Sequence, residues 1–548
     1  MSWTPRTLRE ALAASVAARG DADAVVTGRA RLSWRELETA AWRVAKGLHA
    51  RGLRRGDHVG VLMGNDEKWL ATFYGAALVG AVTVPVNTRF KAPELAFCLK
   101  QADCKALVLA DRFLNIDFAA SLREAEPAVD AGLPGARLPR LEHVVVVGAD
   151  VPRADVPRAG VSWEAFLAAG DAVGEAAIRD AAGAVKPDDL LLIQFTSGTT
   201  AYPKGVMLTH DNMLRDAWAA GSRIGARADD RYFNCRPFFH VAGTTLSALV
   251  SLVFGACLVT LPTFEAGAAL ALMARERCSL ISGNDTLFQL LMSHADFDRS
   301  KLALRGGWAA AGPQTMRRIV EVLGIGAICA AYGLSEASPN VVMSDYRDPL
   351  ELRIAGLARP HEGVELRIAD PHTHAALPPE TAGEIQVRGW SVMRGYYNNP
   401  EANAQAFTPD GWLRTGDLGS LTADGRLRMT GRLKDVFRVG GENVAPAEVE
   451  EVLLAHPAVA NAQVIGVPDA RLGEVPAAYV TLRAGGAATE GDLMAFAKTR
   501  CANFRVPRYL RIVPDFEAIG MTASGKVQKA KLREHALREL GLGEAGKE

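Results

Sequence analysis

The chain has no excess charge of either sign, because 62 lysines and arginines balance 62 aspartates and glutamates in 548 residues. Proteins that bind polyanions depend on surplus Lys and Arg, so nucleic-acid binding is not expected. Hydrophobic residues make up 49% of the chain and charged residues 23%. This composition excludes a disordered chain, a collagen and a coiled coil. The length is enough for three or four units of ~150 residues.

Cysteine is scarce and scattered, with seven residues and no CxxC pair. An odd, dispersed set argues against a disulfide framework or a structural zinc site and favours a reducing compartment. The first residues, 1–14, mix charged and apolar side chains and lack the apolar core of a signal peptide. We therefore predict a cytoplasmic protein.

One long uncharged run, 241–264, needs a membrane test. Its length would allow a span, but Gly255 and Pro262 interrupt it, and polar residues dilute it, namely Thr244, Thr245, Ser247 and Ser251. We expect a buried helix over about 244–254 and a buried strand over 257–261, with no integral membrane association.

Helix and strand patterns alternate along the first part of the chain. Ser33 and Glu36 form a capping-box pattern that opens an amphipathic helix. Apolar strands are expected over 58–63, 81–86 and 105–110. This alternation predicts an α/β fold with layered subdomains and mostly parallel sheets. After about residue 434 short strands and compact turns take over. We predict a large N-terminal domain, 1–433, and a small α+β C-terminal domain, 434–548.

The sharpest motif is the loop over 196–205, which follows an apolar strand, 190–195, and precedes a helix expected near Thr209. Small residues, hydroxyls and a lysine in one loop favour polyphosphate binding, with a polar surface turn as the alternative. The loop is neither a Walker A motif nor a GxGxxG motif. Its candidate ligand-binding residues are Thr196, Ser197, Gly198, Thr199, Thr200 and Lys204.

The loop resembles the TSGTTGxPKG signature of the adenylate-forming superfamily, which contains acyl-CoA synthetases, peptide-synthesis adenylation domains and luciferases. Further matches follow in the family's order: Tyr332–Glu336, Thr415–Asp417, Asp424–Gly425, Gly431–Asp435, Gly440–Val444 with Pro446 and Glu448, and Gly525–Lys526. The resemblance extends from Ser33 to Lys526. It implies an ATP-dependent ligase that converts a carboxylic acid to an acyl-AMP and then to a coenzyme A (CoA) thioester.

The resemblance also assigns a nucleotide site. It places the 196–204 loop at the β- and γ-phosphates of ATP, and Glu336 with Thr199 at Mg²⁺, which prefers oxygen ligands. Asp417 is expected to hold the ribose hydroxyls. Without the resemblance, each residue could also be structural. The other expected nucleotide contacts are Tyr332, Gly333, Ser335 and Arg432.

Lys526 is the expected catalytic residue of the C-terminal domain. Two anions approach each other during adenylation, and a cation at about 4 Å contributes roughly 4 kcal/mol at an effective dielectric of about 20. That is about a thousandfold in rate. The resemblance implies a hinge at Lys434, about which the small domain turns between the two half-reactions. Arg438, Gly440 and Gly441 are expected to face CoA.

The expected acyl pocket combines small and polar residues, with His240 at the carboxylate entry. Its members are His240, Ala242, Asn284, Ala310, Ala331 and Asn340, with Asp285 beside Asn284. This set favours a mid-sized acid, either aryl or short to medium-chain acyl. Ala201 replaces a usual glycine of the family loop and would cost roughly 1–2 kcal/mol if its φ must be positive.

Three alternatives remain open. The acyl acceptor could be a carrier-protein thiol, although no carrier domain follows residue 548 in this sequence. The chain could bind nucleotide or acyl groups without turnover, a reading suggested only by Ala201. Luciferase activity is not excluded by the motifs. The oligomeric state is not specified, and a homodimer is compatible with the sequence.

Overall fold

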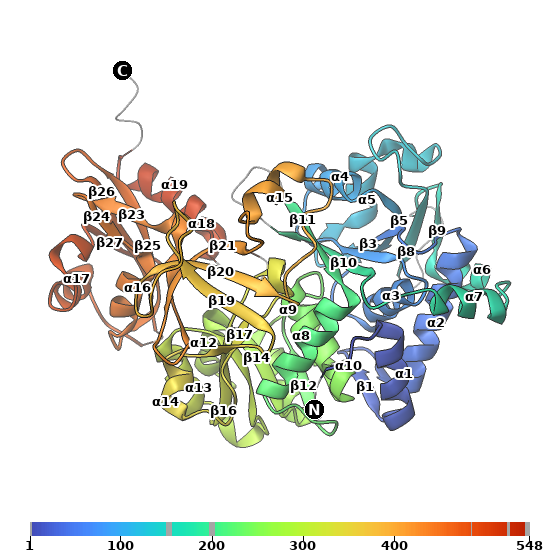
Figure 1. The fold of residues 1–548 in the computed structure, drawn as a ribbon, viewed down its shortest axis with the longest axis horizontal. Coiled ribbons are helices and arrows are strands. Elements are labelled where there is room, and N and C mark those ends of the chain that lie inside the picture. Colours follow the sequence, from blue (N-terminus) through green and yellow to red (C-terminus); the bar gives the residue numbers. More distant parts are fainter. Residues whose placement is uncertain (1–2, 149–155, 197–202, 484, 523–526, 543–548) are drawn as a thin grey trace.

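Four main sheets organise the computed structural model, which describes residues 3–148, 156–196, 203–483, 485–522 and 527–542. In Figure 1 a seven-stranded sheet lies at the upper right and a nine-stranded sheet below it. A four-stranded sheet lies between them and the C-terminal sheet at the left. The predicted α/β class with mostly parallel sheets is confirmed.

The seven-stranded sheet carries the predicted phosphate loop at one edge. All its strand pairs are parallel except the hairpin of β10 and β11. Its strands, in spatial order, are β11 (Lys204–Thr209), β10 (Leu190–Thr196), β4 (Val82–Pro85), β3 (His58–Leu62), β5 (Cys104–Ala110), β8 (His143–Val147) and β9 (Gly160–Ser162).

The nine-stranded sheet has a parallel centre and antiparallel edges. In spatial order its strands are β18 (Arg359–Pro360), β17 (Val342–Met343), β16 (Ala327–Tyr332), β15 (Gly306–Ala310), β14 (Leu280–Asn284), β12 (Arg231–Asn234), β13 (Cys257–Thr260), β1 (Asp23–Val26) and β2 (Arg31–Ser33).

The two faces of this sheet belong to different hydrophobic cores, as the alternation of side chains along a strand requires. Tyr232, Leu280, Trp308 and Cys329 lie in the large core that continues into the seven-stranded sheet. Their neighbours Phe233, Ile281, Ala309 and Ile328 lie in a second core on the opposite face. The register therefore fixes which residues of β12, β14, β15 and β16 can meet on one face.

Two antiparallel sheets complete the chain. The first contains β19 (Val364–Ala369), β20 (Gly383–Gly389), β21 (Leu413–Leu421) and β22 (Leu427–Arg432). The C-terminal sheet contains β24 (Glu442–Val444), β23 (Phe437–Val439), β26 (Gly473–Leu482) and β25 (Val459–Asp469), with β27 (Tyr509–Ile512) parallel to β26. Its hydrophobic clusters contain only residues from Phe437 onward.

Helices cover the sheets on both sides. Those of the N-terminal part are α1 (Leu8–Arg19), α2 (Trp34–Ala50), α3 (Glu67–Leu78), α4 (Ala92–Gln101), α5 (Phe118–Ala125), α6 (Trp163–Gly170), α7 (Glu175–Gly183), α8 (His210–Arg223), α9 (Val241–Gly243), α10 (Val250–Phe254), α11 (Ala266–Glu276), α12 (Asp285–Ser293), α13 (Pro313–Glu321), α14 (Leu350–Ile354) and α15 (Pro400–Ala406). The later ones are α16 (Pro446–Leu454), α17 (Glu490–Lys498), α18 (Glu517–Gly520) and α19 (Lys529–Glu539).

The capping box predicted at the second helix is confirmed. The Ser33 Oγ accepts from the Glu36 backbone N–H, and the Glu36 carboxylate accepts from the Ser33 backbone N–H. The uncharged run also forms largely buried structure. After α9, the helix expected over about 244–254 consists of a π-helix over Thr244–Leu249 and of α10, and the expected strand is β13. In the part of the chain described, no helix is both long and apolar enough to cross a bilayer.

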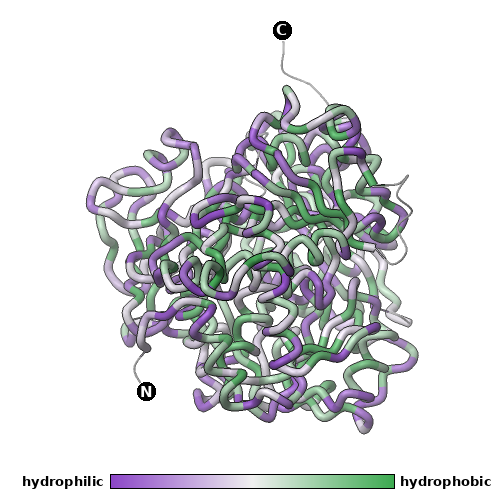
Figure 2. Tube along the Cα trace, turned by 90° about the vertical axis from the view of Figure 1, so that its right-hand side faces the viewer, coloured by the Kyte–Doolittle hydropathy of each residue, from purple (hydrophilic) through white to green (hydrophobic). Residues whose placement is uncertain are grey.

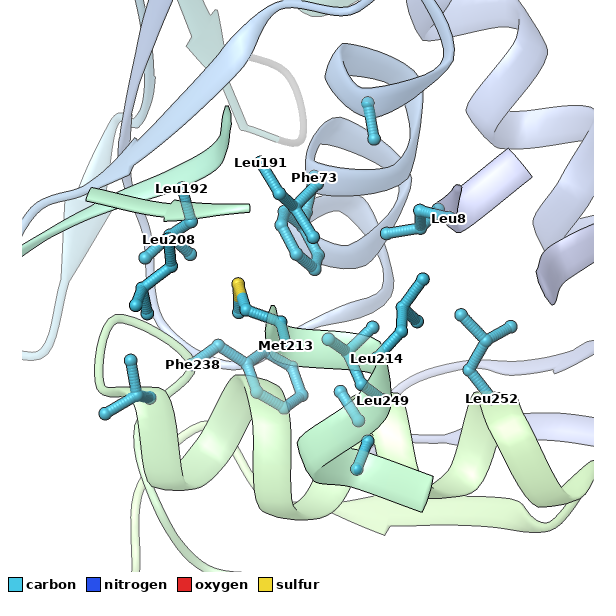
Figure 3. Close-up of a cluster of buried hydrophobic side chains, with 14 of the residues drawn as sticks. Leu8, Phe73, Leu191, Leu192, Leu208, Met213, Leu214, Phe238, Leu249 and Leu252 are labelled. Atoms are coloured by element: carbon cyan, nitrogen blue, oxygen red, sulfur yellow. The ribbon is translucent and has the colours of Figure 1, made fainter. Parts of the chain in front are cut away.

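The large core joins α1, α3, α8, α10 and the hairpin of β10 and β11. Figure 3 shows Leu8, Phe73 and Leu191 converging with Met213 and Leu214 of α8. In Figure 2 hydrophobic stretches run through the interior and hydrophilic ones follow much of the outline. This burial ties the predicted phosphate-loop strands to the helix that follows them.

A substitution at a glycine in β15 can test the register of the nine-stranded sheet. A Cβ at Gly307 would lie 1.7 Å from the Ile281 carbonyl oxygen, and its φ is +136°. Gly307→Ala is expected to cost about 3 kcal/mol or more, because backbone must move. Thermal denaturation checks this against Gly326→Ala, where a Cβ meets nothing within 4 Å. Equal melting temperatures would contradict the register.

Candidate nucleotide and acyl site

The predicted phosphate loop connects two paired strands. Thr196 at the end of β10 lies opposite Lys204 at the start of β11. The sequence predicted a helix as the next element, but the strand β11 comes first, and Thr209 then caps α8. Ser197, Gly198, Thr199, Thr200 and Ala201 lie outside the described residues, as does Lys526.

Lys204 and Glu336 meet around a tyrosine that the sequence analysis did not select. The Lys204 Nζ lies 5.1 Å from the centre of the Tyr396 ring. The Tyr396 hydroxyl donates to the Glu336 Oε1 at 2.9 Å. Burial, followed by the Glu336 charge, raises the pKa of Tyr396, so its hydroxyl stays protonated and donates. A carboxylate and an ammonium group thus lie beside the base of the loop.

Tyr396 is held there by backbone pairing. The Met207 N–H donates to the Gly395 carbonyl and the Tyr397 N–H donates to the Gly205 carbonyl. The segment 394–397 therefore adds an irregular strand outside β11. Its only sequence signal is a pair of tyrosines after a glycine, which by itself specifies no site.

A second carboxylate lies where β16 meets the four-stranded sheet. Asp417 of β21 is 4% exposed. Its Oδ2 accepts from the Tyr332 hydroxyl at 2.9 Å, and its Oδ1 lies 3.2 Å from the Arg432 Nε. Asp417 and Arg432 are direct cross-strand neighbours. Burial and the Asp417 charge raise the pKa of Tyr332. Three predicted nucleotide residues from separate motifs are thus brought together.

The short segment between Tyr332, which binds Asp417, and Glu336 is tightly packed. A Cβ at Gly333 would lie 1.8 Å from the Pro339 carbonyl oxygen, so this position requires glycine. Ser335 begins the turn Ser335–Ala337, which also carries Glu336. Tyr332, Gly333, Ser335 and Glu336 therefore follow one another along the carboxyl end of β16, where open parallel sheets bind ligands.

His240 caps the segment that covers the nine-stranded sheet. Its Nδ1 accepts from the Ala242 N–H at 3.1 Å, and Ala242 is buried. Just before it, the Phe239 carbonyl accepts from the Gln194 Nε2 at 3.0 Å. Because Gln194 lies two residues before Thr196, this bond positions His240 relative to the phosphate loop.

Three expected acyl-pocket residues form a row at the carboxyl ends of neighbouring strands. Asn284 of β14 pairs with Ala310 of β15. The register of β15 and β16 places Ala331 next to Ala310 on the same face. Beside them the Asp285 carboxylate accepts from the Gly312 N–H at 3.3 Å, and burial raises its pKa.

Asn340 has a different position from the one expected. Its Nδ2 donates to the Tyr332 and Val342 carbonyls, and its Oδ1 lies 2.6 Å from the His361 Nε2. It is 2% exposed. Its amide therefore holds the Tyr332 backbone carbonyl and presents no polar atoms to an acid. The sequence could not reveal this, because the partners come from three different segments.

The expected CoA-facing residues form a hairpin in the C-terminal sheet. Gly440 and Gly441 have φ values of +58° and +95° between β23 and β24, as two-residue hairpin loops require. Arg438 is exposed and donates to the Asn443 Oδ1. Lys434 is exposed in the turn Leu433–Asp435 that links β22 to this sheet.

Two family models match most of the chain. The model of the AMP-binding enzyme family matches residues 12–397, and that of the AMP-binding enzyme C-terminal domain matches residues 448–526. The chain is 35% identical over 535 residues to the putative acyl-CoA synthetase YngI of Bacillus subtilis (strain 168), covering 95% of each.

A second relative and a solved structure are similar along their whole length. The 3-[(3aS,4S,7aS)-7a-methyl-1,5-dioxo-octahydro-1H-inden-4-yl]propanoyl:CoA ligase of Rhodococcus jostii (strain RHA1) is 38% identical over 540 residues, which are 97% of this chain and 99% of that protein. The crystal structure of the anthranilate CoA ligase AuaEII with anthranoyl-AMP aligns with a TM-score of 0.83 at 25% identity, covering 98% and 99%.

The His361–Asn340 bond predicts a pH effect on stability. Burial lowers the pKa of His361 from 6.5 to about 3, so between these values the unfolded chain binds a proton that the folded chain does not. Stability is therefore lost as the pH falls below 6.5. Between pH 7.5 and 5.0, the free energy of unfolding of His361→Gln should fall by about 2 kcal/mol less than that of the wild type.

Urea denaturation at the two pH values measures this difference. The exposed His372 provides the matched control, and His372→Gln should keep the wild-type pH dependence. Identical pH dependence of wild type and His361→Gln would show that the pKa of His361 is the same in the folded and the unfolded chain, and would contradict the prediction.

Proposed function

The chain belongs to the AMP-binding enzymes and is an AMP-forming acyl-CoA ligase, and on that basis we propose which of its residues carry the two half-reactions. It uses ATP to convert a carboxylic acid to an acyl-AMP and transfers the acyl group to CoA. The proposal concerns the residue roles, the domain boundary, Mg²⁺ and the acid.

The observation that carries the proposal is that residues from separate motifs meet in two groups, one of them at the base of the phosphate loop. Lys204, Glu336 and Tyr396 lie at its base, and Asp417, Tyr332 and Arg432 lie together near the end of β16. A carboxylate is a natural acceptor for two ribose hydroxyls, while a lysine provides charge for phosphates. We assign the first group to the phosphates and the second to the ribose and adenine.

Glu336 fits a Mg²⁺ ligand, with Thr199 as the expected second. Mg²⁺ usually takes one or two protein carboxylates together with substrate phosphates. Among the described residues no group of three His, Cys, Asp or Glu side chains could hold a metal ion, so the site would depend on ATP oxygens. When bound, Mg²⁺ neutralises phosphate charge. Tyr396 donates to one Glu336 oxygen and so orients that carboxylate.

We propose that residues 434–548 turn as a unit about Lys434. The separate C-terminal cores and the exposed position of Lys434 support this boundary. In one orientation Lys526 would stabilise the charge that develops at the α-phosphate. In the other, the hairpin with Arg438, Gly440 and Gly441 would border the CoA thiol. Turning a rigid unit about few residues lets one site present two sets of groups.

A mid-sized acid is the proposed substrate. His240, Ala242 and the row of Asn284, Ala310 and Ala331 would surround its chain. The Rhodococcus jostii relative is named for a dioxo-octahydroindenyl propanoyl group and the structural neighbour for anthranilate, both of intermediate size. We place the reaction in the cytoplasm, since all seven cysteines are free.

Thioester formation by the purified protein tests the function directly. A panel of aryl, short-chain and medium-chain acids is incubated with ATP, Mg²⁺ and CoA, and AMP and acyl-CoA are quantified. Acid-dependent AMP release that requires CoA for full turnover is expected. AMP release that depends on a carrier-protein thiol and not on CoA would favour the alternative acceptor.

Lys526→Ala is expected to slow acyl-adenylate formation about a thousandfold, because the cation that stabilises the α-phosphate is lost. The rate at which preformed acyl-AMP and CoA are converted to thioester should change less than tenfold. Rapid-quench assays of each half-reaction measure both values. Lys498→Ala, at an exposed lysine of α17, is the matched control. Equal loss in both half-reactions would contradict a role limited to adenylation.

Glu336→Gln is expected to raise the Mg²⁺ concentration needed for half-maximal ATP–pyrophosphate exchange by at least tenfold, since one charged oxygen ligand is lost. Tyr396→Phe should raise it less, because it removes only the hydrogen bond that orients Glu336. A titration of Mg²⁺ at fixed ATP measures both. If neither variant changes the Mg²⁺ dependence, Glu336 is not a metal ligand.

A further inference from the structure

Four polar side chains meet on one face of the nine-stranded sheet, next to the row of expected acyl-pocket residues. They are Tyr232 of β12, Ser282 of β14, Trp308 of β15 and Arg236, which follows β12; we call them the donor cluster. Tyr232 and Ser282 are 0% exposed and Trp308 is 3% exposed. Such burial of polar groups is normally accompanied by complete hydrogen bonding.

The donor cluster is held together by contacts that use only part of its hydrogen-bonding capacity. The Arg236 guanidinium lies over the Trp308 ring, 4.7 Å from its centre. The Tyr232 hydroxyl interacts with the side chains of Ser282, Trp308 and Ser247. Among the described residues, five buried atoms nevertheless lack a protein hydrogen bond of good geometry: Arg236 Nε and Nη2, Tyr232 Oη, Ser282 Oγ and Trp308 Nε1.

Hydrogen-bond donors outnumber acceptors among these five atoms. The guanidinium and the indole can only donate, and the two hydroxyls can donate or accept. The groups of the cluster can therefore satisfy one another only in part, and several donors must find an acceptor elsewhere. Each buried donor without a partner destabilises the fold, because its lost hydrogen bonds to water are not replaced.

Arg236 adds an uncompensated positive charge. Among the described residues no carboxylate forms an ion pair with it, and burial lowers its pKa. The groups that favour its charged form are only Cys235 and Tyr232, which are neutral at ordinary pH. The Arg236 side chain as a whole is half-buried. A half-buried arginine without an acidic partner favours binding of an anion or of a strongly polar oxygen.

The register places the cluster one step deeper than the expected acyl-pocket row. Ser282 and Trp308 pair with each other, and Asn284 and Ala310 form the next pair on the same face toward the strand ends. Two residues along a strand correspond to about 7 Å. An acid whose carboxyl group lies near His240, at the strand ends, would therefore extend its far end toward the cluster.

The π-helix that packs against β12 also supports a ligand-binding role for the donor cluster. The π-helix Thr244–Leu249 contacts α8 and β12, and its Ser247 faces the Tyr232 hydroxyl. π-Helical turns occur frequently at functional sites. A regular α-helix would place Ser247 differently, so the irregular turn and the donor cluster form one structural feature.

We propose that the donor cluster binds an oxygen acceptor at the far end of the substrate's acyl group, so that the acid activated by this enzyme carries a second carbonyl or carboxylate group. This proposal rests on the proposed function, which supplies the position of the reacting carboxyl group. Arg236 and Trp308 would then determine which acid is bound, while the nucleotide residues act on every acid alike.

Three acids of equal length test the proposal: octanoate, its 7-oxo derivative and octanedioate. Dissociation constants are measured by calorimetry with a non-hydrolysable ATP analogue present, and ATP–pyrophosphate exchange is measured in parallel. The wild type should bind at least one oxygenated acid about tenfold or more tightly than octanoate, as expected for hydrogen bonds to a charged donor. Preference for the dioic acid indicates an anion, and preference for the oxo acid a neutral carbonyl.

Arg236→Met keeps most of the side-chain volume and removes the charge and the donors. It should reduce the ratio of oxygenated-acid to octanoate affinity at least tenfold. Trp308→Phe keeps an aromatic ring, although a smaller one, and removes one donor, so it should reduce the same ratio less. It provides a second variant if Arg236→Met fails to fold. Arg29→Met, at an exposed arginine, is the matched control and should keep the wild-type ratio.

The outcomes separate the two proposals. Equal binding of all three acids, or no binding of any, overturns the role of the donor cluster; a cluster filled by structural water predicts equal binding. A selective affinity that Arg236→Met abolishes, without pyrophosphate exchange, supports the cluster and contradicts the catalytic assignment. Exchange with octanoate as efficient as with its oxygenated analogues supports catalysis and overturns the cluster.

Discussion

The buried carboxylate of Asp417 connects the two sheets from which the nucleotide site is built. It accepts from Tyr332, at the end of the nine-stranded sheet, and pairs with Arg432 on the neighbouring strand of the four-stranded sheet. A buried carboxylate is tolerated only when such partners compensate its desolvation. The position of the four-stranded sheet, and of the link to the C-terminal sheet after Arg432, therefore depends on this contact.

Support for Tyr332 comes from a second set of buried polar groups. His361 holds Asn340, and Asn340 binds the Tyr332 backbone carbonyl. The tyrosine is thus fixed at its hydroxyl by Asp417 and at its backbone by Asn340. A residue fixed at both ends is suited to present one face to a flat ligand at little conformational cost.

The fold class could be predicted from the sequence because its signals are local, and the candidate phosphate loop was selected on local signals too. Alternating apolar strands and helices indicate parallel α/β layers, and glycines, hydroxyls and a lysine mark a phosphate loop within ten residues. The residue Asn340 shows the limit of this approach: a short motif shows that a residue is special, but not which segments surround it. Its partners lie at positions 332, 342 and 361.

Other features depended on pairing that no local pattern specifies. The strand β11 was missed because Lys204–Thr209 reads equally well as the approach to a helix. Tyr396 lies near Lys204 only because the 394–397 segment pairs with β11. Arg236 lies over Trp308 only because of the register of β12, β14 and β15, which no local pattern around Arg236 specifies.

The proposed assignments separate the chemistry from the choice of acid. The groups assigned to ATP lie at the strand ends and on the hairpin, whereas the donor cluster lies about 7 Å deeper than the expected acyl-pocket row of Asn284 and Ala310. Leaving donors unpaired in that interior lowers stability, and an apolar core of the same volume would be more stable. Such a cost is reasonable where a ligand completes the hydrogen bonds, because the same unpaired donors then disfavour any acid that lacks an acceptor. Exclusion of unsubstituted acids would thus follow from the polar groups themselves, without any change in the residues that act on the nucleotide.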